Sequence, residues 1–171
     1  MNRNNKAVMI CTIALFLALE IILTRFLSIS TPILRLSFGF LPIAMLAIMY
    51  GPVWAGVAYA LGDLIGAILF PIGPYFPGFT LTAGLSGLAF GLVLYKHPVT
   101  FKRSLIASMI VVLCFDLVLN TYWLNVLYGQ AFLALLPTRF MKAVLAIPIE
   151  TILIPLAWKR IFSKIPQSGR Y

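Results

Sequence analysis

Long apolar runs, broken at short intervals by proline, glycine or charge, dominate the chain. A membrane-spanning helix needs about 20 mainly apolar residues. The pattern predicts six such helices, at residues 7–27, 38–50, 52–70, 78–95, 104–127 and 138–158. The second run is short, and Tyr50-Gly51-Pro52 separates it from the third because glycine and proline end helices. A count of four or five spans is the alternative, since the second run could be a broken one.

The most unusual break between runs is the segment FPIGPYFPGF, residues 70–79. Proline at every third position prevents a helix from passing through, because proline lacks an N–H and clashes with the preceding turn. Four aromatic rings distinguish the segment from a flexible polar loop. We expect a stiff connector whose rings form one wall of a binding site. An aromatic belt at the membrane surface is the alternative.

The composition points to a single integral membrane domain over residues 1–171. Hydrophobic residues make up 62% of the chain, charged residues make up 10%, and the mean hydropathy is +1.04. A soluble domain has about 25% charged residues. So little polar surface predicts an all-α protein embedded in a lipid bilayer. The net charge of +9 comes from cations at the ends of the runs, and no basic stripe indicates a nucleic-acid partner.

The distribution of basic residues predicts the orientation. Six spans place both termini on one side, together with nine cations: Arg3, Lys6, Lys96, Lys102, Arg103, Lys159, Arg160, Lys164 and Arg170. By the positive-inside rule both termini are then cytoplasmic. The first run is too long for the apolar part of a signal peptide and contains Glu20, so we expect it to be retained.

Each of the four acidic residues lies inside an apolar run. Ionisable groups within a bilayer are costly, and they mark a functional site or a buried partner pair. Asp63 shares one helix face with Ala67 and Phe70, and this face leads up to the connector. Asp116 shares a face with Asn120 and Trp123. The alternatives are structural: Asp116 could be a hydrogen-bonding hub, and Glu20 and Glu150 could pair with cations or hydroxyl groups.

Four cations lie on the side opposite the termini: Arg25, Arg35, Arg139 and Lys142. Pro137 and Thr138 can begin the last helix, and an arginine at a helix N-terminus forms an anion site. Arg25 and Lys142 could instead be interfacial anchors.

Aromatic rings, carboxylates, amides and cations at one end suit a planar heterocycle with an acidic tail. We expect the ring to stack on the connector and Trp123, with Asn120 and Asp63 or Asp116 at its polar edge. The expected substrate-binding residues are Arg25, Arg35, Asp63, Phe70, Tyr75, Phe76, Phe79, Asp116, Asn120, Trp123, Arg139 and Lys142.

We expect neither a cofactor nor a metal site, because the two cysteines lie in separate runs and the one histidine lies in a turn. No catalytic residue is expected either, since Ser86 has no histidine within the membrane to act as its base.

Several segments together resemble the substrate-binding S-components of energy-coupling factor (ECF) vitamin transporters, and most closely the folate-specific branch. They are Arg35-Leu-Ser-Phe-Gly-Phe-Leu-Pro-Ile43, Gly51-Pro52, Asp63-Leu-Ile-Gly-Ala67, LFPIGPYFPGF at 69–79, Leu119-Asn-Thr-Tyr-Trp-Leu124 and Leu135-Leu-Pro-Thr-Arg139. The connector and the Leu-Pro-Thr-Arg element are the specific ones, whereas the Gly-Pro turn is common.

The resemblance implies six helices, one vitamin bound near the outer face of a bacterial plasma membrane, and no catalysis. It implies docking on a shared transmembrane coupling subunit driven by two ABC-type ATPases. The family's AxxxA contact motif for that subunit corresponds to Ala14 and Ala18. The alternatives are an S-component for riboflavin or thiamine, an intramembrane enzyme, or a purely structural subunit. Thiamine is cationic, so the outward cations argue against it.

Overall fold

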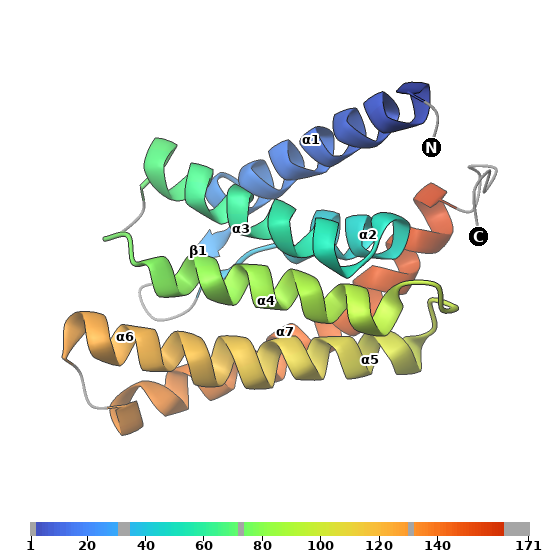
Figure 1. The fold of residues 1–171 in the computed structure, drawn as a ribbon. Helices are drawn as coiled ribbons and strands as arrows, with labels where there is room; N and C mark the ends of the chain where they lie inside the picture. Colours follow the sequence, from blue (N-terminus) through green and yellow to red (C-terminus); the bar gives the residue numbers. More distant parts are fainter. Residues whose placement is uncertain (1–2, 31–34, 72–73, 130–131, 163–171) are drawn as a thin grey trace.

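The computed structural model describes residues 3–30, 35–71, 74–129 and 132–162, which form a helical bundle (Figure 1). The helices are α1 (Arg3–Arg25), α2 (Phe40–Tyr50), α3 (Pro52–Leu69), α4 (Pro77–Leu94), α5 (Phe101–Met109), η1 (Ile110–Leu119), α6 (Asn120–Tyr128), α7 (Phe132–Ala157) and η2 (Trp158–Phe162). Two short strands, β1 (Ile29–Ser30) and β2 (Arg35–Leu36), pair antiparallel between α1 and α2. Helices therefore lie at all six predicted positions, with this strand pair as an addition.

Within the described ranges, five helices are long and apolar enough to cross a membrane: Lys6–Arg25, Pro52–Leu69, Pro77–Leu94, Phe101–Leu127 and Leu136–Arg160. The fourth of these is one continuous rod in which α5, the π-helical η1 and α6 follow one another (Figure 1). Pro52 and Pro77 each begin a helix, a position where the missing N–H of proline costs nothing.

The start of the last helix was predicted wrongly. Helix α7 begins at Phe132, so Pro137 lies inside it together with Pro148 and Pro155. Membrane helices tolerate interior prolines because neighbouring helices and local adjustments satisfy the freed carbonyl groups. Arg139 consequently lies about two turns into the helix, and the expected anion site at a helix N-terminus is absent there.

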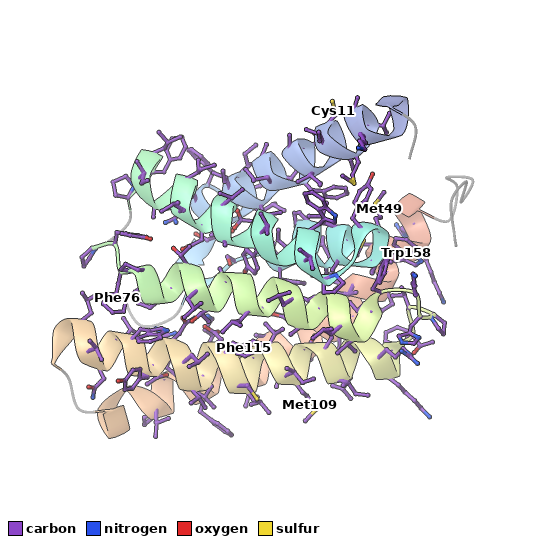
Figure 2. All side chains as sticks on the ribbon, in the orientation of Figure 1. Cys11, Met49, Phe76, Met109, Phe115 and Trp158 are labelled. Carbon is purple, nitrogen blue, oxygen red and sulfur yellow. The ribbon has the colours of Figure 1, made fainter. Side chains whose placement is uncertain are left out.

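Helix α2 forms the centre of the core. Its 11 residues would extend only about 16 Å, roughly half the thickness of a bilayer's hydrocarbon layer. Ile43, Ala44, Leu46 and Ala47 are completely buried, as expected of a helix that is apolar on every side. The long helices surround it and expose apolar side chains outward, as Cys11 and Met109 show in Figure 2. A lipid-facing exterior explains these exposed residues.

The two ends of the bundle differ. The start of α1 and the end of η2 lie at one end, which also contains the α2–α3 and α4–α5 turns (Figure 1). The opposite end contains the strand pair, the end of α3, the start of α4, the end of α6 and the start of α7. We call it the connector end.

Helices α3 and α4 pack closely because glycines line their contact. A Cβ atom placed on Gly87 would lie 2.5 Å from the carbonyl oxygen of Ala55 and 2.9 Å from the Cα atom of Gly56. A Cβ atom on Gly84, one turn away, would meet its nearest neighbour at 3.5 Å, an ordinary contact. Small residues at such interfaces allow two helix backbones to approach each other.

We therefore predict that Gly87→Ala destabilises the protein and that the matched variant Gly84→Ala does not. The methyl group at position 87 meets backbone atoms that cannot move aside, and overpacking of this kind costs about 1–3 kcal/mol. Thermal unfolding in detergent measures the effect as a lower Tm for Gly87→Ala only. Equal melting temperatures for the two variants would show that the α3–α4 contact is looser than described.

Candidate functional site

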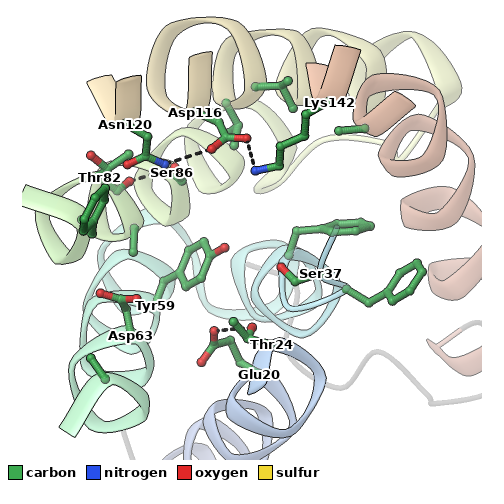
Figure 3. A pocket seen from close by; sticks show the side chains of 18 of the residues that line it. Glu20, Thr24, Ser37, Tyr59, Asp63, Thr82, Ser86, Asp116, Asn120 and Lys142 are labelled. Atoms are coloured by element: carbon green, nitrogen blue, oxygen red, sulfur yellow. Dashed lines mark hydrogen bonds and ion pairs between the residues drawn. The ribbon is translucent and has the colours of Figure 1, made fainter. Parts of the chain in front are cut away.

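A cavity of about 380 Å³ opens among the helices at the connector end (Figure 3). Helices α1, α3, α4, η1, α6 and α7 line it, together with Ser37, Phe38, Phe40 and the connector residues Pro74, Tyr75, Phe76 and Phe79. This volume lies within the range of sites for small organic ligands, about 300–1,000 Å³. The walls combine apolar surface with polar groups and with six charged side chains: Glu20, Arg25, Asp63, Asp116, Lys142 and Glu150.

The first polar group near the mouth joins α1 to α3. The Arg25 guanidinium lies 3.6 Å from the Asp63 carboxylate and donates a hydrogen bond to the Asp63 carbonyl oxygen at 3.3 Å. Thr80 of α4 donates to the other Asp63 oxygen at 2.8 Å, and the Tyr75 hydroxyl lies 3.2 Å from that of Thr80. Gly66 leaves the space for Arg25, because a Cβ atom there would lie 2.7 Å from its Nε atom.

The second polar group joins η1 to α7 around Asp116. Lys142 donates to one carboxylate oxygen at 2.5 Å (Figure 3), while Asn120 donates to the other at 2.9 Å and Arg139 lies 3.7 Å from it. A carboxylate only accepts hydrogen bonds, so the amide nitrogen of Asn120 must face Asp116. The amide oxygen of Asn120 is then left buried without a partner among the described residues.

Aromatic side chains form the wall between these two groups. The Phe76 ring lies 6.1 Å from Phe79 and 5.6 Å from Trp123, measured between centroids. The Trp123 indole N–H donates to Thr82 of α4 at 3.1 Å. Gly78 allows this packing, since a Cβ atom there would lie 2.5 Å from the indole. Contact between the Phe76 and Trp123 rings thus fixes the connector to α6, while its prolines restrict its backbone.

Eight of the twelve residues predicted from sequence line the cavity: Arg25, Asp63, Tyr75, Phe76, Phe79, Asp116, Asn120 and Lys142. Trp123 lies behind Phe76, and Arg139 lies behind Asp116. Phe70 packs edge-on against Phe26, with ring centroids 5.0 Å apart, and is not among the lining residues. The side chain of Arg35 lies outside the described part of the chain.

Sequence reasoning missed three residues deeper in the cavity: Glu20, Tyr59 and Glu150. It treated the two glutamates as structural, and it did not consider Tyr59. Glu20 is 1% exposed and Glu150 is 7% exposed. The Tyr59 side chain points into the middle of the cavity, between Glu20 and Lys142 (Figure 3). The available signal was helical spacing, because Glu150 shares a face with Lys142 and Ala146.

Neighbouring small residues hold Glu20 in place. Thr24, one turn along α1, donates to its Oε1 atom at 2.9 Å. A Cβ atom on Gly62 of α3 would overlap with Oε2, so only glycine leaves room for this carboxylate. The Oε2 atom has no hydrogen-bond partner among the described residues.

An apolar layer closes the cavity below Glu20, Tyr59 and Glu150. The residues one turn further along the same helices, away from the connector end, are Phe16, Ala55 and Ile154, and all three belong to the buried core. Phe90 of α4 completes the layer below Ser86 and is fully buried. This layer closes the cavity on the side away from the connector end. Within the described ranges, no three His, Cys, Asp or Glu side chains are grouped so that they could hold a metal ion.

Comparison with known proteins gave concordant results. The family model described as "ECF transporter, substrate-specific component" matches residues 8–157. Two relatives named "Folate transporter FolT" come from Clostridium novyi (45% identical, 86% of each chain) and Leuconostoc mesenteroides (35% identical, 81% of this chain and 77% of the relative).

A solved structure titled "Crystal structure of FolT bound with folic acid" is similar throughout. It has a TM-score of 0.79 and 33% sequence identity, and the match covers 90% of this chain and 91% of that one. The family match spans all the helices that line the cavity. This chain belongs to the substrate-specific components of the ECF transporters.

Proposed function

We propose that this protein is the membrane-embedded folate-binding subunit of an ECF transporter. The observation that carries the proposal is similarity along almost the whole chain to folate transporters named FolT, one of them solved with folic acid. The cavity supports it independently, since it combines a closed polar end, an aromatic wall and cations near the mouth. Folate has matching parts: a donor-rich heterocycle, an aromatic linker and a glutamate tail.

The residues proposed to bind folate are those that line the cavity mouth and the side chains directly behind them. Tyr75, Phe76 and Phe79 provide the aromatic wall, and Trp123 fixes its position. Proline restricts the connector backbone before the ligand arrives, so less conformational entropy is lost on binding. Phe70 is the weakest member of the predicted set, because it packs on Phe26 outside the lining.

The glutamate tail is proposed to lie near the cations at the mouth. Arg25 and Lys142 line the cavity there, with Arg139 behind them, and each is already paired with a carboxylate. The tail therefore has to share these cations with Asp63 and Asp116 rather than find free ones. Arg35 lies in β2 at the same end and is proposed as a further anion contact.

The partners proposed are the shared transmembrane coupling subunit and two ABC-type ATPases. The sequence contains no glycine-rich ATP-binding loop, so energy for transport would come from an ion gradient or from such a partner. Ala14 and Ala18 lie one turn apart on α1 and are both exposed. A small-xxx-small pair of this kind lets another membrane helix approach closely.

The proposed location is a bacterial plasma membrane, with six spans if α2 is counted and with both termini in the cytoplasm. Lys96, Lys102, Lys159 and Arg160 all lie at the end of the bundle opposite the cavity. This asymmetry of cations would place the cavity mouth on the outer side. The role is ligand binding and delivery, without a catalysed reaction.

A panel of vitamins tests the proposed ligand. The purified protein in detergent is expected to show a higher Tm with folic acid and no shift with riboflavin, thiamine or biotin. A ligand present at about 100 times its Kd stabilises the native state by about 2.7 kcal/mol. A shift with riboflavin alone would reassign the substrate, and no shift with any vitamin would contradict the proposal.

The proposed contact between Arg25 and the glutamate tail can be tested with the variant Arg25→Met. We expect the variant to bind folic acid about tenfold more weakly, because a charge-assisted contact with the tail is lost. Its affinity for pteroic acid, which lacks the glutamate, should change less than about threefold. Isothermal titration of both ligands measures this, with Lys102→Met at the opposite end as the matched control. Equal losses for the two ligands would remove Arg25 from the tail site.

The docking motif can be separated from ligand binding. Ala14→Leu with Ala18→Leu should leave folic acid affinity unchanged and reduce folate uptake more than about tenfold in cells that express the partner subunits, since bulky side chains block close helix contact. Leu15→Phe, also exposed on α1, serves as the control and should retain uptake. Normal uptake by the double variant would place the partner contact elsewhere.

A further inference from the structure

The unpaired polar atoms of the cavity share one chemical character. Among the described residues, three buried side-chain atoms on the cavity lining have no hydrogen-bond partner: Glu20 Oε2, Glu150 Oε2 and Asn120 Oδ1. All three are acceptors. The other buried atoms without a partner are the hydroxyl groups of Ser104, Ser108 and Thr151, which do not line the cavity.

Burying an acceptor without a donor is costly, and for a carboxylate the cost is several kcal/mol. A ligand that brings N–H groups into this space removes that cost. A ligand that brings only acceptors or negative charge adds to it. The cavity therefore selects for a molecule whose leading edge carries hydrogen-bond donors.

The depth of the charges fixes which end of such a molecule enters first. Glu20 lies five residues beyond Arg25 along α1, about 7.5 Å further from the mouth. Glu150 lies eight residues beyond Lys142 along α7, about 12 Å further in. On each of these two helices the cation therefore lies nearer the mouth than the glutamate does, so an anionic tail is attracted toward the mouth and repelled by the carboxylates further in.

Of the two glutamates, Glu20 has the better-organised carboxylate. Thr24 fixes its Oε1 atom at 2.9 Å, and the absence of a side chain at Gly62 leaves room for Oε2. Figure 3 shows the carboxylate at the edge of the cavity, below the Tyr59 ring. Asp63 and Asp116 are less suited to this task, because hydrogen bonds and cations already occupy their oxygens.

We propose that Glu20 determines ligand specificity by accepting hydrogen bonds from adjacent N–H donors on the heterocycle at the closed end of the cavity. The proposal rests on the proposed function, in which the ligand is folate. The 2-amino group and the neighbouring ring N–H of folate form such an edge, and a carboxylate pairs with two parallel donors in a favourable bidentate geometry. Glu20 would thus distinguish a 2-amino heterocycle from one that lacks this group.

The test compares folic acid with an analogue in which hydrogen replaces the 2-amino group. Kd values are measured by titration of the full-length protein in detergent. The wild-type protein should bind the analogue about 10- to 100-fold more weakly than folic acid, the usual effect of losing a hydrogen bond to a charged group. The Glu20→Gln variant should bind folic acid more weakly by a similar factor, and its Kd for the analogue should change less than about threefold. The discrimination between the two ligands then disappears.

Glu150→Gln is the matched comparison, because it makes the same substitution in the same cavity and should keep the discrimination. The Gly62→Ala variant is a second test, because its methyl group displaces the Glu20 carboxylate without removing it. This variant should also lose the discrimination between the two ligands. Equal weakening of both ligands by Glu20→Gln, or discrimination lost only in Glu150→Gln, would overturn the role of Glu20. Failure of the wild-type protein to bind folic acid would overturn the proposed function itself, and this proposal with it.

Discussion

The pairing of buried charges inside an apolar bundle is the constraint on which the rest of this structure depends. Four carboxyl groups lie within the membrane-embedded helices, where an unpaired charge is expensive. Asp63 is balanced by Arg25 and a threonine hydroxyl, and Asp116 is balanced by Lys142, Arg139 and Asn120. These pairs join α1 to α3 and η1 to α7, on opposite sides of the cavity. They hold the helices of each wall together and fix the positions of the cations.

Small residues make this arrangement of charges possible. Gly62 and Gly66, one turn apart on α3, leave the space that Glu20 and Arg25 occupy on α1. Gly78 does the same for Trp123 where the connector joins α4. A glycine in a membrane helix is often explained by close backbone contact, and Gly87 fits that explanation. Beside the cavity, the glycines instead accommodate the side chains of Glu20, Arg25 and Trp123, so the candidate site and the close helix packing depend on different glycines.

Much of the fold could be predicted from hydrophobic pattern alone. Apolar runs of about 20 residues located the long helices, and the break at Tyr50-Gly51-Pro52 correctly separated the short α2 from α3. The start of α7 could not be located in this way, because proline begins helices and also occurs inside those of membrane proteins. The register of β1 with β2 depends on pairing across a turn, which no local pattern specifies.

The candidate site was predicted where polar residues clustered near the mouth and was missed where a single acid lay among apolar residues. Asp116, Asn120 and Trp123 recur at helical spacing, so one face could be recognised. Glu20 has no such companion apart from Thr24, and its importance depends on Gly62 from another helix. Long-range juxtaposition of this kind is a property of packing rather than of sequence spacing. The four acids lie on four different helices, yet all four line the same cavity.

The proposed orientation of the ligand depends on two features of the cavity. Paired cations lie toward the mouth, and unpaired hydrogen-bond acceptors lie further in. The most direct measurement is an experimental structure of this protein with folic acid bound. We predict that the heterocycle lies at the closed end, with its 2-amino group within hydrogen-bonding distance of Glu20. The glutamate tail should lie near Arg25 and Lys142. A complex with the tail at the closed end and the heterocycle at the mouth would contradict the account.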